Sequence, residues 1–361
     1  MLILFFYYFL SVISGIELCV STTVRDNKIY TICQDRELGY VKSKVYELEE
    51  GPTANITCSE KTFELGSFPK GYKLVFIDVL DNSLDSHNRL WVRADLNQSI
   101  SEQQNDSYRS WVGYIKLDDM SLKTDSSIIK FPTHEKFPIF GYTTNRITNE
   151  FGSALYVTGG GLYSKKDDNY SINNSFFKYN FTTKEWIDIT YSTNGKLKPM
   201  IRHKSVVIDN RYLVILGGYV EYSKDSPERL NGNKSIFEYY SLYNLTVFDT
   251  FTNSFNSVNI KPDLFDTSIA TLQFNSFLAT VYNDKIIVLG GYVGKDGSIS
   301  MNSNSYLGIL DYNSKTWTWD RIVRDDSEEN YYDTLGSNLL AYNNQLVILQ
   351  VNKQIQFVYT T

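Results

Sequence analysis

The hydrophobic residues of this chain gather in short runs that alternate with turn-forming residues. One arrangement recurs, in which an apolar strand, a short polar turn and a second apolar strand are followed by paired glycines. It is clearest in GSALYVTGGG (Gly152 to Gly161), VVIDNRYLVILGGY (Val206 to Tyr219) and TVYNDKIIVLGGY (Thr280 to Tyr292). The polar turn letters in these runs are typical of tight hairpins. The pattern therefore predicts a repeated antiparallel hairpin.

Three weaker copies extend this pattern toward both ends of the chain. LAYNNQLVILQV (Leu340 to Val351) and VRDNKIYTICQD (Val24 to Asp35) keep the hairpin but lack the glycines, and the weakest copy begins near GYKLVFIDV (Gly71 to Val79). The six copies start near residues 24, 71, 152, 206, 280 and 340. This recurrence indicates a chain built from one repeated unit.

A second signature follows each clear glycine pair. A large apolar residue, six intervening residues and an aromatic residue appear in YNFTTKEW, FDTFTNSF and LDYNSKTW. Each segment predicts a third strand, a polar turn and a fourth strand, with two large side chains packed across the hairpin. The predicted pairs are Tyr179 with Trp186, Phe248 with Phe255, and Leu310 with Trp317.

The composition favours strands over helices and makes nucleic acid a poor partner. Among 361 residues there are 28 Tyr and 21 Phe, and 21 Gly outnumber 7 Pro, which suits strands joined by tight turns. The formal net charge of −6 provides no excess of cations for phosphate groups. We therefore expect an all-β protein that does not bind nucleic acid.

These features resemble the kelch family, whose repeat is a four-stranded antiparallel blade with two glycines closing the second strand. The resemblance is clearest between residues 145 and 320 and implies a kelch-type β-propeller of four-stranded blades. Glycine suits its place because adjacent blades converge there and a side chain would crowd the turn. The matching glycines are Gly159, Gly160, Gly217, Gly218, Gly290 and Gly291.

We expect one propeller domain over residues 17–361, with divergent blades at 17–140. Six blades are predicted, and seven if residues 36–140 contain another. The last copy has room for three strands, so the segment from Ile16 to Thr22 is expected to supply its fourth strand and close the ring.

The N-terminus predicts export. Residues 1–16 are apolar and resemble a signal peptide cleaved at roughly residues 14 to 20, an uncleaved membrane anchor being the alternative. No anchor signal is found at the C-terminal end. Eight glycosylation sequons support an exported glycoprotein, at Asn55, Asn97, Asn105, Asn169, Asn173, Asn180, Asn233 and Asn244. Cys33 and Cys58 are predicted to form a disulfide, although Cys19 is a third cysteine if it survives cleavage.

The sequence suggests no catalytic, metal or cofactor site. Some kelch propellers are copper oxidases that need several imidazole ligands. The three histidines here, His87, His134 and His203, stand in different parts of the chain. A nucleophile elbow of the Gly-x-Ser-x-Gly type is also missing.

The longest connections join second to third strands, which places them on one rim of an antiparallel meander. They run from Leu162 to Asn174, from Glu221 to Tyr239 and from Val293 to Asn304. Long loops on a rigid scaffold commonly carry recognition. The middle connection supplies the candidate binding residues Arg229, Tyr239 and Tyr240, which are of types enriched at interfaces. Tyr219 and Tyr292 are further candidates, because each follows a glycine pair and is expected near the mouth of the central channel.

We therefore predict a non-catalytic propeller, secreted or at the cell surface, that binds a protein or a glycan. The alternative is an exported carbohydrate-active enzyme with acidic residues at the propeller channel.

Overall fold

The computed structural model describes residues 17–35, 39–48, 58–69, 71–96, 108–164, 169–221, 237–261, 273–294, 306–321, 337–342 and 345–350. The chain divides into two compact units. Unit 1 comprises Met1–Ile77, Asp81–Phe131 and Leu335–Thr361, and unit 2 comprises Asp78–Leu80 and Pro132–Thr334. The predicted signal peptide, residues 1–16, lies outside the described residues.

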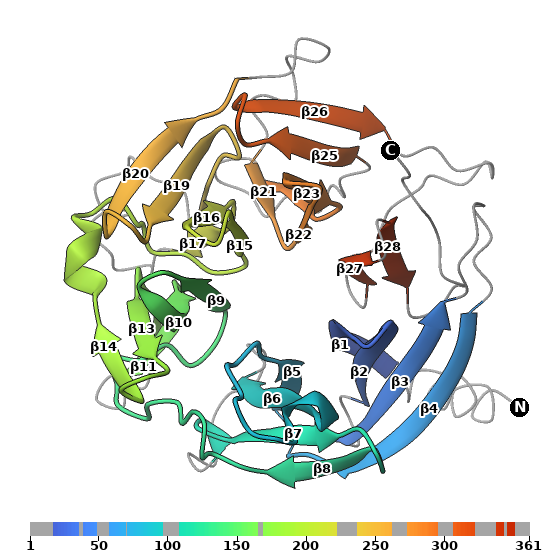
Figure 1. Ribbon diagram of the computed structural model, residues 1–361. Helices are drawn as coiled ribbons and strands as arrows, with labels where there is room; N and C mark the ends of the chain where they lie inside the picture. Colours follow the sequence, from blue (N-terminus) through green and yellow to red (C-terminus); the bar gives the residue numbers. More distant parts are fainter. Residues whose placement is uncertain are drawn as a thin grey trace, which may run out of the picture. The chain divides into compact units, whose positions relative to one another are not determined.

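Unit 1 is built from antiparallel sheets (Figure 1). One sheet has the order β1 (Glu17–Arg25), β2 (Lys28–Asp35), β3 (Tyr40–Leu48) and β4 (Cys58–Ser67). A second has the order β5 (Tyr72–Phe76), β6 (Arg89–Leu96), β7 (Val112–Lys116) and β8 (Ser121–Thr124), with the 3-10 turn η1 (Ser86–Asn88) before β6. The strands β27 (Ser337–Tyr342) and β28 (Gln345–Gln350) pair with each other. Strand β1 lies beside both β5 and β27.

Unit 2 contains three four-stranded antiparallel sheets. Their strands, in spatial order, are β9 (Thr143–Asn149), β10 (Gly152–Thr158), β13 (Phe176–Asn180) and β14 (Glu185–Asp188); β15 (Lys204–Ile208), β16 (Tyr212–Leu216), β19 (Asn244–Asp249) and β20 (Ser254–Asn259); and β22 (Leu278–Tyr282), β23 (Lys285–Leu289), β25 (Tyr306–Asp311) and β26 (Thr316–Arg321). The first strand β15 lies beside both β9 and β22, so the sheet of β15 stands between the other two.

Short two-stranded ribbons extend from the sheets of unit 2. They pair β11 (Gly161–Ser164) with β12 (Asn169–Ile172), β17 (Tyr219–Glu221) with β18 (Phe237–Tyr239), and β21 (Gln273–Asn275) with β24 (Tyr292–Gly294). A 3-10 turn, η3 (Thr190–Thr193), follows β14. Among the described residues, no helix is long and apolar enough to cross a membrane.

The strand count differs from the sequence prediction. The described residues form five four-stranded sheets, whereas β27 and β28 make a two-stranded sheet, so five complete blades replace the predicted six. The prediction that Ile16 to Thr22 completes the last blade is wrong, because β1 pairs with β2. Asp26 and Asn27 both have left-handed backbone angles, and such a two-residue turn folds β1 straight back along β2.

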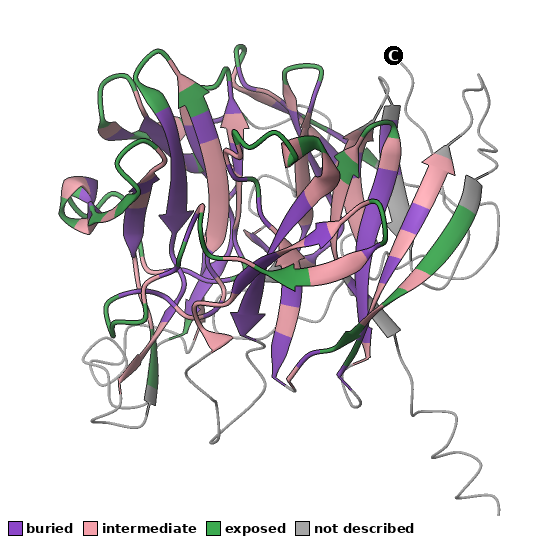
Figure 2. Ribbon diagram, turned by 60° about the horizontal axis from the view of Figure 1, so that its bottom comes forward, coloured by how far each residue is buried: buried purple, intermediate pink, exposed green. Residues whose placement is uncertain are grey.

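The buried cores lie between neighbouring sheets. Figure 2 shows buried residues along the strands and exposed residues concentrated in the turns. One core joins Tyr156 and Phe176 of the first sheet of unit 2 to Phe248 and Phe255 of the second. Phe248 and Phe255 are register partners, as are Tyr179 with Trp186 and Leu310 with Trp317. The predicted pairs therefore stand across the hairpins that join third and fourth strands.

Each glycine pair lies where three stretches of backbone meet, as Gly217 and Gly218 illustrate. The N–H of Gly218 donates to the carbonyl of Phe274, at 2.9 Å, in the segment that leads into the next sheet. A Cβ on Gly217 would lie 2.5 Å from that carbonyl oxygen. A Cβ on Gly218 would lie 2.8 Å from the carbonyl oxygen of Ile201, in the segment that leads into its own sheet. Only glycine leaves room for both lead-in segments.

The same junction occurs one sheet earlier. The N–H of Gly160 donates to the carbonyl of Met200 at 2.8 Å, and a Cβ on Gly159 would lie 2.7 Å from that oxygen. The described glycines of the three pairs all have positive φ, between 54° and 103°. Close approach and left-handed geometry therefore coincide, and both favour glycine.

We predict that Gly217→Ala destabilises the protein by about 3 kcal/mol or more, because the left-handed strain adds to a clash with the Phe274 carbonyl. Gly195 is the matched control, since it also has positive φ, at 72°, but has no neighbour within 4 Å of a built Cβ. Gly195→Ala should cost only about 1 to 2 kcal/mol. Urea unfolding of both variants measures the difference, and equal losses would contradict the crowding argument.

The disulfide differs from the predicted pairing of Cys33 with Cys58. Cys33 is bonded to Cys19, its register partner across β1 and β2. Cys33 stands opposite Lys42 of β3, which in turn stands opposite Glu64 of β4. Cys58 is six residues further along β4, roughly 20 Å away along the strand, whereas a disulfide requires Cα atoms within about 7 Å.

Peptide mapping without reduction should therefore recover a linked pair of peptides that contain Cys19 and Cys33. Cys58 should be recovered outside that linkage. A peptide pair linked through Cys33 and Cys58 would show that the assigned bond is incorrect.

Candidate functional site

The segments that lead into the three sheets of unit 2 share a left-handed residue at the same position. Gly141, Arg202 and Ser276 have φ values of 68°, 54° and 57°, and each stands two residues before the first strand of its sheet. Arginine is costly there, because a side chain disfavours this backbone region. Arg202 is exposed. Arg202 therefore places an exposed cation at a position where glycine would be unstrained.

The Arg202 side chain reaches across two sheets of unit 2. Its guanidinium carbon lies 5.9 Å from the centre of the Tyr219 ring, within the range of a cation–π contact. Its Nη1 donates to Oγ of Ser276 at 3.4 Å, in the lead-in segment of the next sheet. The N–H of Ser276 donates to the carbonyl of Arg202 at 3.2 Å. These contacts hold the Arg202 guanidinium group in place.

Strands β17 and β18 form the base of the longest predicted loop and bring together three of its aromatic side chains. Tyr219 is paired in register with Tyr239, and their ring centres are 5.5 Å apart. Phe237 packs edge-on against Tyr219 at 5.7 Å. Tyr219 and Tyr239 are only 8% and 5% exposed, and burial raises the pKa of Tyr239. The two tyrosines therefore support the surface, while Arg202 and the partly exposed Phe237 face solvent.

Tyr240 lies beside this cluster. Its hydroxyl donates to the carbonyl of Pro199 at 2.9 Å, and Nζ of Lys198 lies 5.4 Å from its ring centre. Lys198 also pairs with Glu238 at 3.5 Å. We name the surface formed by Lys198, Arg202, Phe237 and Tyr240 over Tyr219 and Tyr239 the ribbon rim. It combines aromatic faces with cations on a base ordered by backbone pairing.

The other predicted binding residues lie apart from this group or outside the residues that the structure describes. Tyr292 begins β24, is partly exposed and pairs in register with Asn275. Arg229 lies outside the described residues, as do the sequon asparagines Asn55, Asn97, Asn105 and Asn233. Asn169 begins β12, and Asn173 follows it. Asn180 ends β13, and Asn244 begins β19 with an exposed side chain.

The histidines occupy separate environments. His87 is exposed in η1 of unit 1, and His134 is exposed in unit 2 with its ring 6.1 Å from that of Phe177. Within the described ranges, no group of three or more His, Cys, Asp and Glu side chains is placed to hold a metal ion.

His203 is buried at the junction between the first two sheets of unit 2. Its Nε2 lies 3.2 Å from the hydroxyl oxygens of both Thr143 and Thr158. Burial, with a smaller effect of Lys204, lowers the pKa of its imidazole to about 3. Phe277 takes the corresponding place before the third sheet, where its ring lies beside the Cβ position of Gly217. His203 therefore fills a ring-shaped slot between glycines as a neutral side chain.

The arrangement of sheets matches solved structures over almost the whole chain. The structure of YjhT covers 96% of this chain and 96% of that chain, with a TM-score of 0.51 and 12% identity. The fold is a β-propeller. A fungal alcohol oxidase of the AA5 family, in complex with copper, covers 95% of this chain and 72% of that chain, with a TM-score of 0.50 and 10% identity. No protein-family model and no curated protein matches the sequence. At these identities the likeness concerns the propeller fold alone.

Sequence reasoning missed Arg202, although a signal for it was present. Aligning the three propeller lead-in segments, FGY (residues 140–142), IRH (201–203) and NSF (275–277), sets Arg202 against Gly141 and Ser276. A long cation replacing small residues in a repeat is the exception that deserves a functional test.

The propeller should lose stability in mild acid because of His203. The unfolded imidazole takes up a proton below about pH 6.5, whereas the folded one stays neutral down to about pH 3. Stability contributed by the neutral side chain is therefore complete above pH 6.5 and falls as the pH decreases toward 3. We expect about 2 kcal/mol less stability at pH 5 than at pH 7.5.

Urea unfolding at the two pH values measures this effect, and His203→Phe is the matched variant because Phe277 occupies the equivalent slot. The variant should lose most of the pH dependence between 5 and 7.5. An unchanged pH dependence would assign the effect to other groups.

Proposed function

We propose that this propeller is an exported, non-catalytic binding module that recognises a protein or a glycan through its ribbon rim. The observation that carries the proposal is Arg202, an exposed cation held in a strained backbone conformation over a tyrosine. Strained residues of this kind concentrate at functional positions, because the surrounding fold must offset their cost. Tyrosine and arginine are also the residue types that dominate binding energy at interfaces.

Pre-organisation of the rim supports the same proposal. The backbone pairing of β17 with β18 fixes Phe237, and hydrogen bonds from Arg202 and Tyr240 fix two more side chains before any ligand arrives. A rigid surface loses less conformational entropy on binding, which favours affinity. Export is supported by the disulfide between Cys19 and Cys33 together with the signal-like N-terminus.

The copper of the fungal oxidase finds no counterpart among the described residues of this propeller. Two of the three histidines are exposed and the third has its Nε2 against two threonine hydroxyls.

Arg202→Gly tests the proposal with little risk to folding, because glycine prefers the backbone conformation that Arg202 adopts. The secreted chain is applied to glycan and protein arrays, and the affinity of each hit is then measured. Arg202→Gly should keep or raise the melting temperature and weaken binding by about 30-fold, the effect of losing a hot-spot residue. Lys184→Gly is the matched control, as Lys184 is also exposed with positive φ, at 59°, but stands in the turn between β13 and β14.

A second variant tests the loop. Residues 222–236 are replaced by Asn-Gly, which retains the register pair of Glu221 with Phe237. If binding survives this change but not Arg202→Gly, the rim alone recognises the ligand. If Arg202→Gly and Lys184→Gly bind equally well, the proposed surface is wrong.

A further inference from the structure

Two phenylalanines stand exposed in turns where the sibling sheets carry polar residues. Phe151 is 68% exposed in the turn between β9 and β10, and Phe251 is 41% exposed in the turn between β19 and β20. In the other two sheets of unit 2, the turn between the first and second strands contains Asp209-Asn210-Arg211 or Asn283-Asp284. The residue equivalent to Phe251 is Thr182 in one neighbouring sheet and Asn313 in the other. The repeat fold therefore does not require aromatic residues there.

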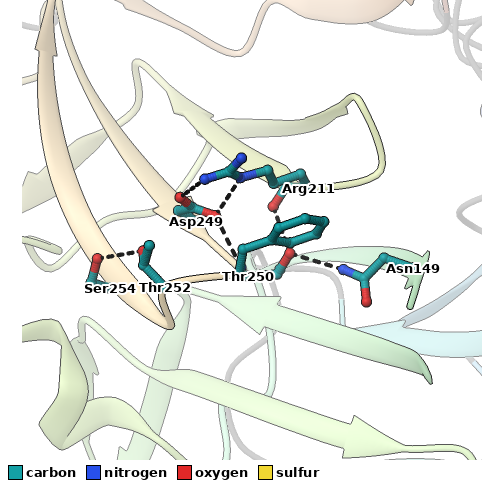
Figure 3. A network of polar contacts seen from close by, with 7 residues as sticks. Asn149, Arg211, Asp249, Thr250, Thr252 and Ser254 are labelled. Atoms are coloured by element: carbon teal, nitrogen blue, oxygen red, sulfur yellow. Dashed lines mark hydrogen bonds and ion pairs between the residues drawn. The ribbon is translucent and has the colours of Figure 1, made fainter. Parts of the chain in front are cut away.

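The two rings meet on a rigid base. Their centres are 5.2 Å apart in an edge-to-face arrangement, and the Arg211 guanidinium carbon lies 4.6 Å from the Phe251 ring centre. Figure 3 shows how this base is tied together: Arg211 donates to both carboxylate oxygens of Asp249, at 2.8 and 2.6 Å. Asn149 donates to Oγ1 of Thr250 at 3.0 Å, which links the two turns. Hydrogen bonds from Arg211 lower the pKa of Asp249 to about 2, so the pair stays charged in mild acid.

A predicted glycosylation sequon stands near Phe151 in the strand register, on the face of its sheet that packs against the next sheet. Asn180 stands opposite Ala154 in the register of β13 and β10, so both side chains point to one face. Ala154 packs in one core with Phe248 and Phe255 of the next sheet. Phe151 contacts Phe251 of that same sheet. Phe151 is three residues along the chain from Ala154, roughly 10 Å. The first sugars of an N-linked glycan span that distance.

The Asn180 side chain is held in one orientation. Its Oδ1 accepts hydrogen bonds from the N–H groups of Thr182 and Thr183, at 2.8 and 3.3 Å. The N–H of Phe181 donates to the carbonyl of Ser153 at 3.3 Å, which binds the sequon turn to the strand that follows Phe151. A sugar attached at Nδ2 would therefore start from a fixed point beside the exposed rings.

We propose that the N-linked glycan of Asn180 packs over the Phe151–Phe251 pair and shields it from water. This inference rests on the export that is part of the proposed function. The modification joins Nδ2 of Asn180 to the reducing-end carbon of a lipid-linked oligosaccharide, the amide losing a proton as the lipid diphosphate leaves. The apolar faces of the sugars then cover aromatic surface that the protein itself leaves exposed.

A double-mutant cycle tests the contact in protein secreted by a eukaryotic host behind a host signal peptide. Thr182→Ala removes the sequon while it keeps the Asn180 turn, because Asn180 accepts from the backbone N–H of residue 182. Phe151→Ser restores the polar character of the sibling turns. Each single change should lower the melting temperature by roughly 2 to 4 °C. The melting temperature of the double variant should fall by no more than that of one single variant, because both changes remove the same contact. Asn244→Gln, at an exposed sequon in unit 2, is the control and should add independently to Phe151→Ser.

Glycopeptide mass spectrometry measures the sugar occupancy of each sequon, which is independent of the melting temperature. Sugar at Asn180 together with a non-additive cycle supports the proposal. Sugar at other sequons but not at Asn180, or an additive cycle, overturns the glycan contact and leaves the binding function of the ribbon rim standing. The absence of sugar from every sequon also overturns the contact, and because the host signal peptide directs secretion in this test, it leaves the predicted export to be judged separately.

Discussion

The architecture depends on the junction where two lead-in segments cross a pair of glycines. At Gly217 and Gly218 the carbonyl of Phe274 and the carbonyl of Ile201 both lie closer than a Cβ permits, and the backbone is left-handed at both residues. The hydrogen bond from Gly218 to Phe274 joins one sheet to the segment that starts the next. Because this hydrogen bond joins neighbouring sheets, it sets the spacing between them. The ring of Phe277, in the lead-in segment, fills the space beside Gly217.

The same junction explains where the proposed recognition residues stand. A lead-in segment crosses the glycine pair and therefore emerges beside the ribbon that follows the glycines. Its left-handed residue is Gly141 in one sheet, Ser276 in another and Arg202 in the sheet between them. The fold thus repeats a left-handed position, and in the middle sheet this position carries an exposed cation over the aromatic ribbon.

The sequence predicted much of the fold because its repeats are local. Paired glycines, and large apolar and aromatic residues with six residues between them, predict hairpins directly, and Tyr179 does stand opposite Trp186. The prediction was weaker for features that depend on contacts between residues far apart in the sequence. Cys33 has two candidate partners in the sequence, and only the register of β1 to β4 separates Cys19 from the distant Cys58. The fourth strand of the last blade was misassigned because ring closure was expected of the segment before the Asp26-Asn27 turn, whereas that turn pairs the segment with β2.

The candidate surface could be predicted only in outline. The long connection drew attention to Tyr239 and the glycine pair to Tyr219, but the sequence alone does not reveal that both tyrosines are buried or that Arg202, from another segment, lies over Tyr219. Cross-strand pairing determines burial here, and it is a property of the folded sheet. The predicted role of Arg229 stays a prediction, because that residue lies outside the described part of the chain.

Hydrogen exchange of the secreted propeller, with and without a ligand selected on the arrays, tests the central claim most directly. The account predicts slower exchange of backbone amides in Lys198–Arg202 and Phe237–Tyr240 when the ligand is bound. Exchange in the turn that carries Phe151 should stay unchanged. Protection confined to that turn, or to unit 1, would contradict recognition by the ribbon rim.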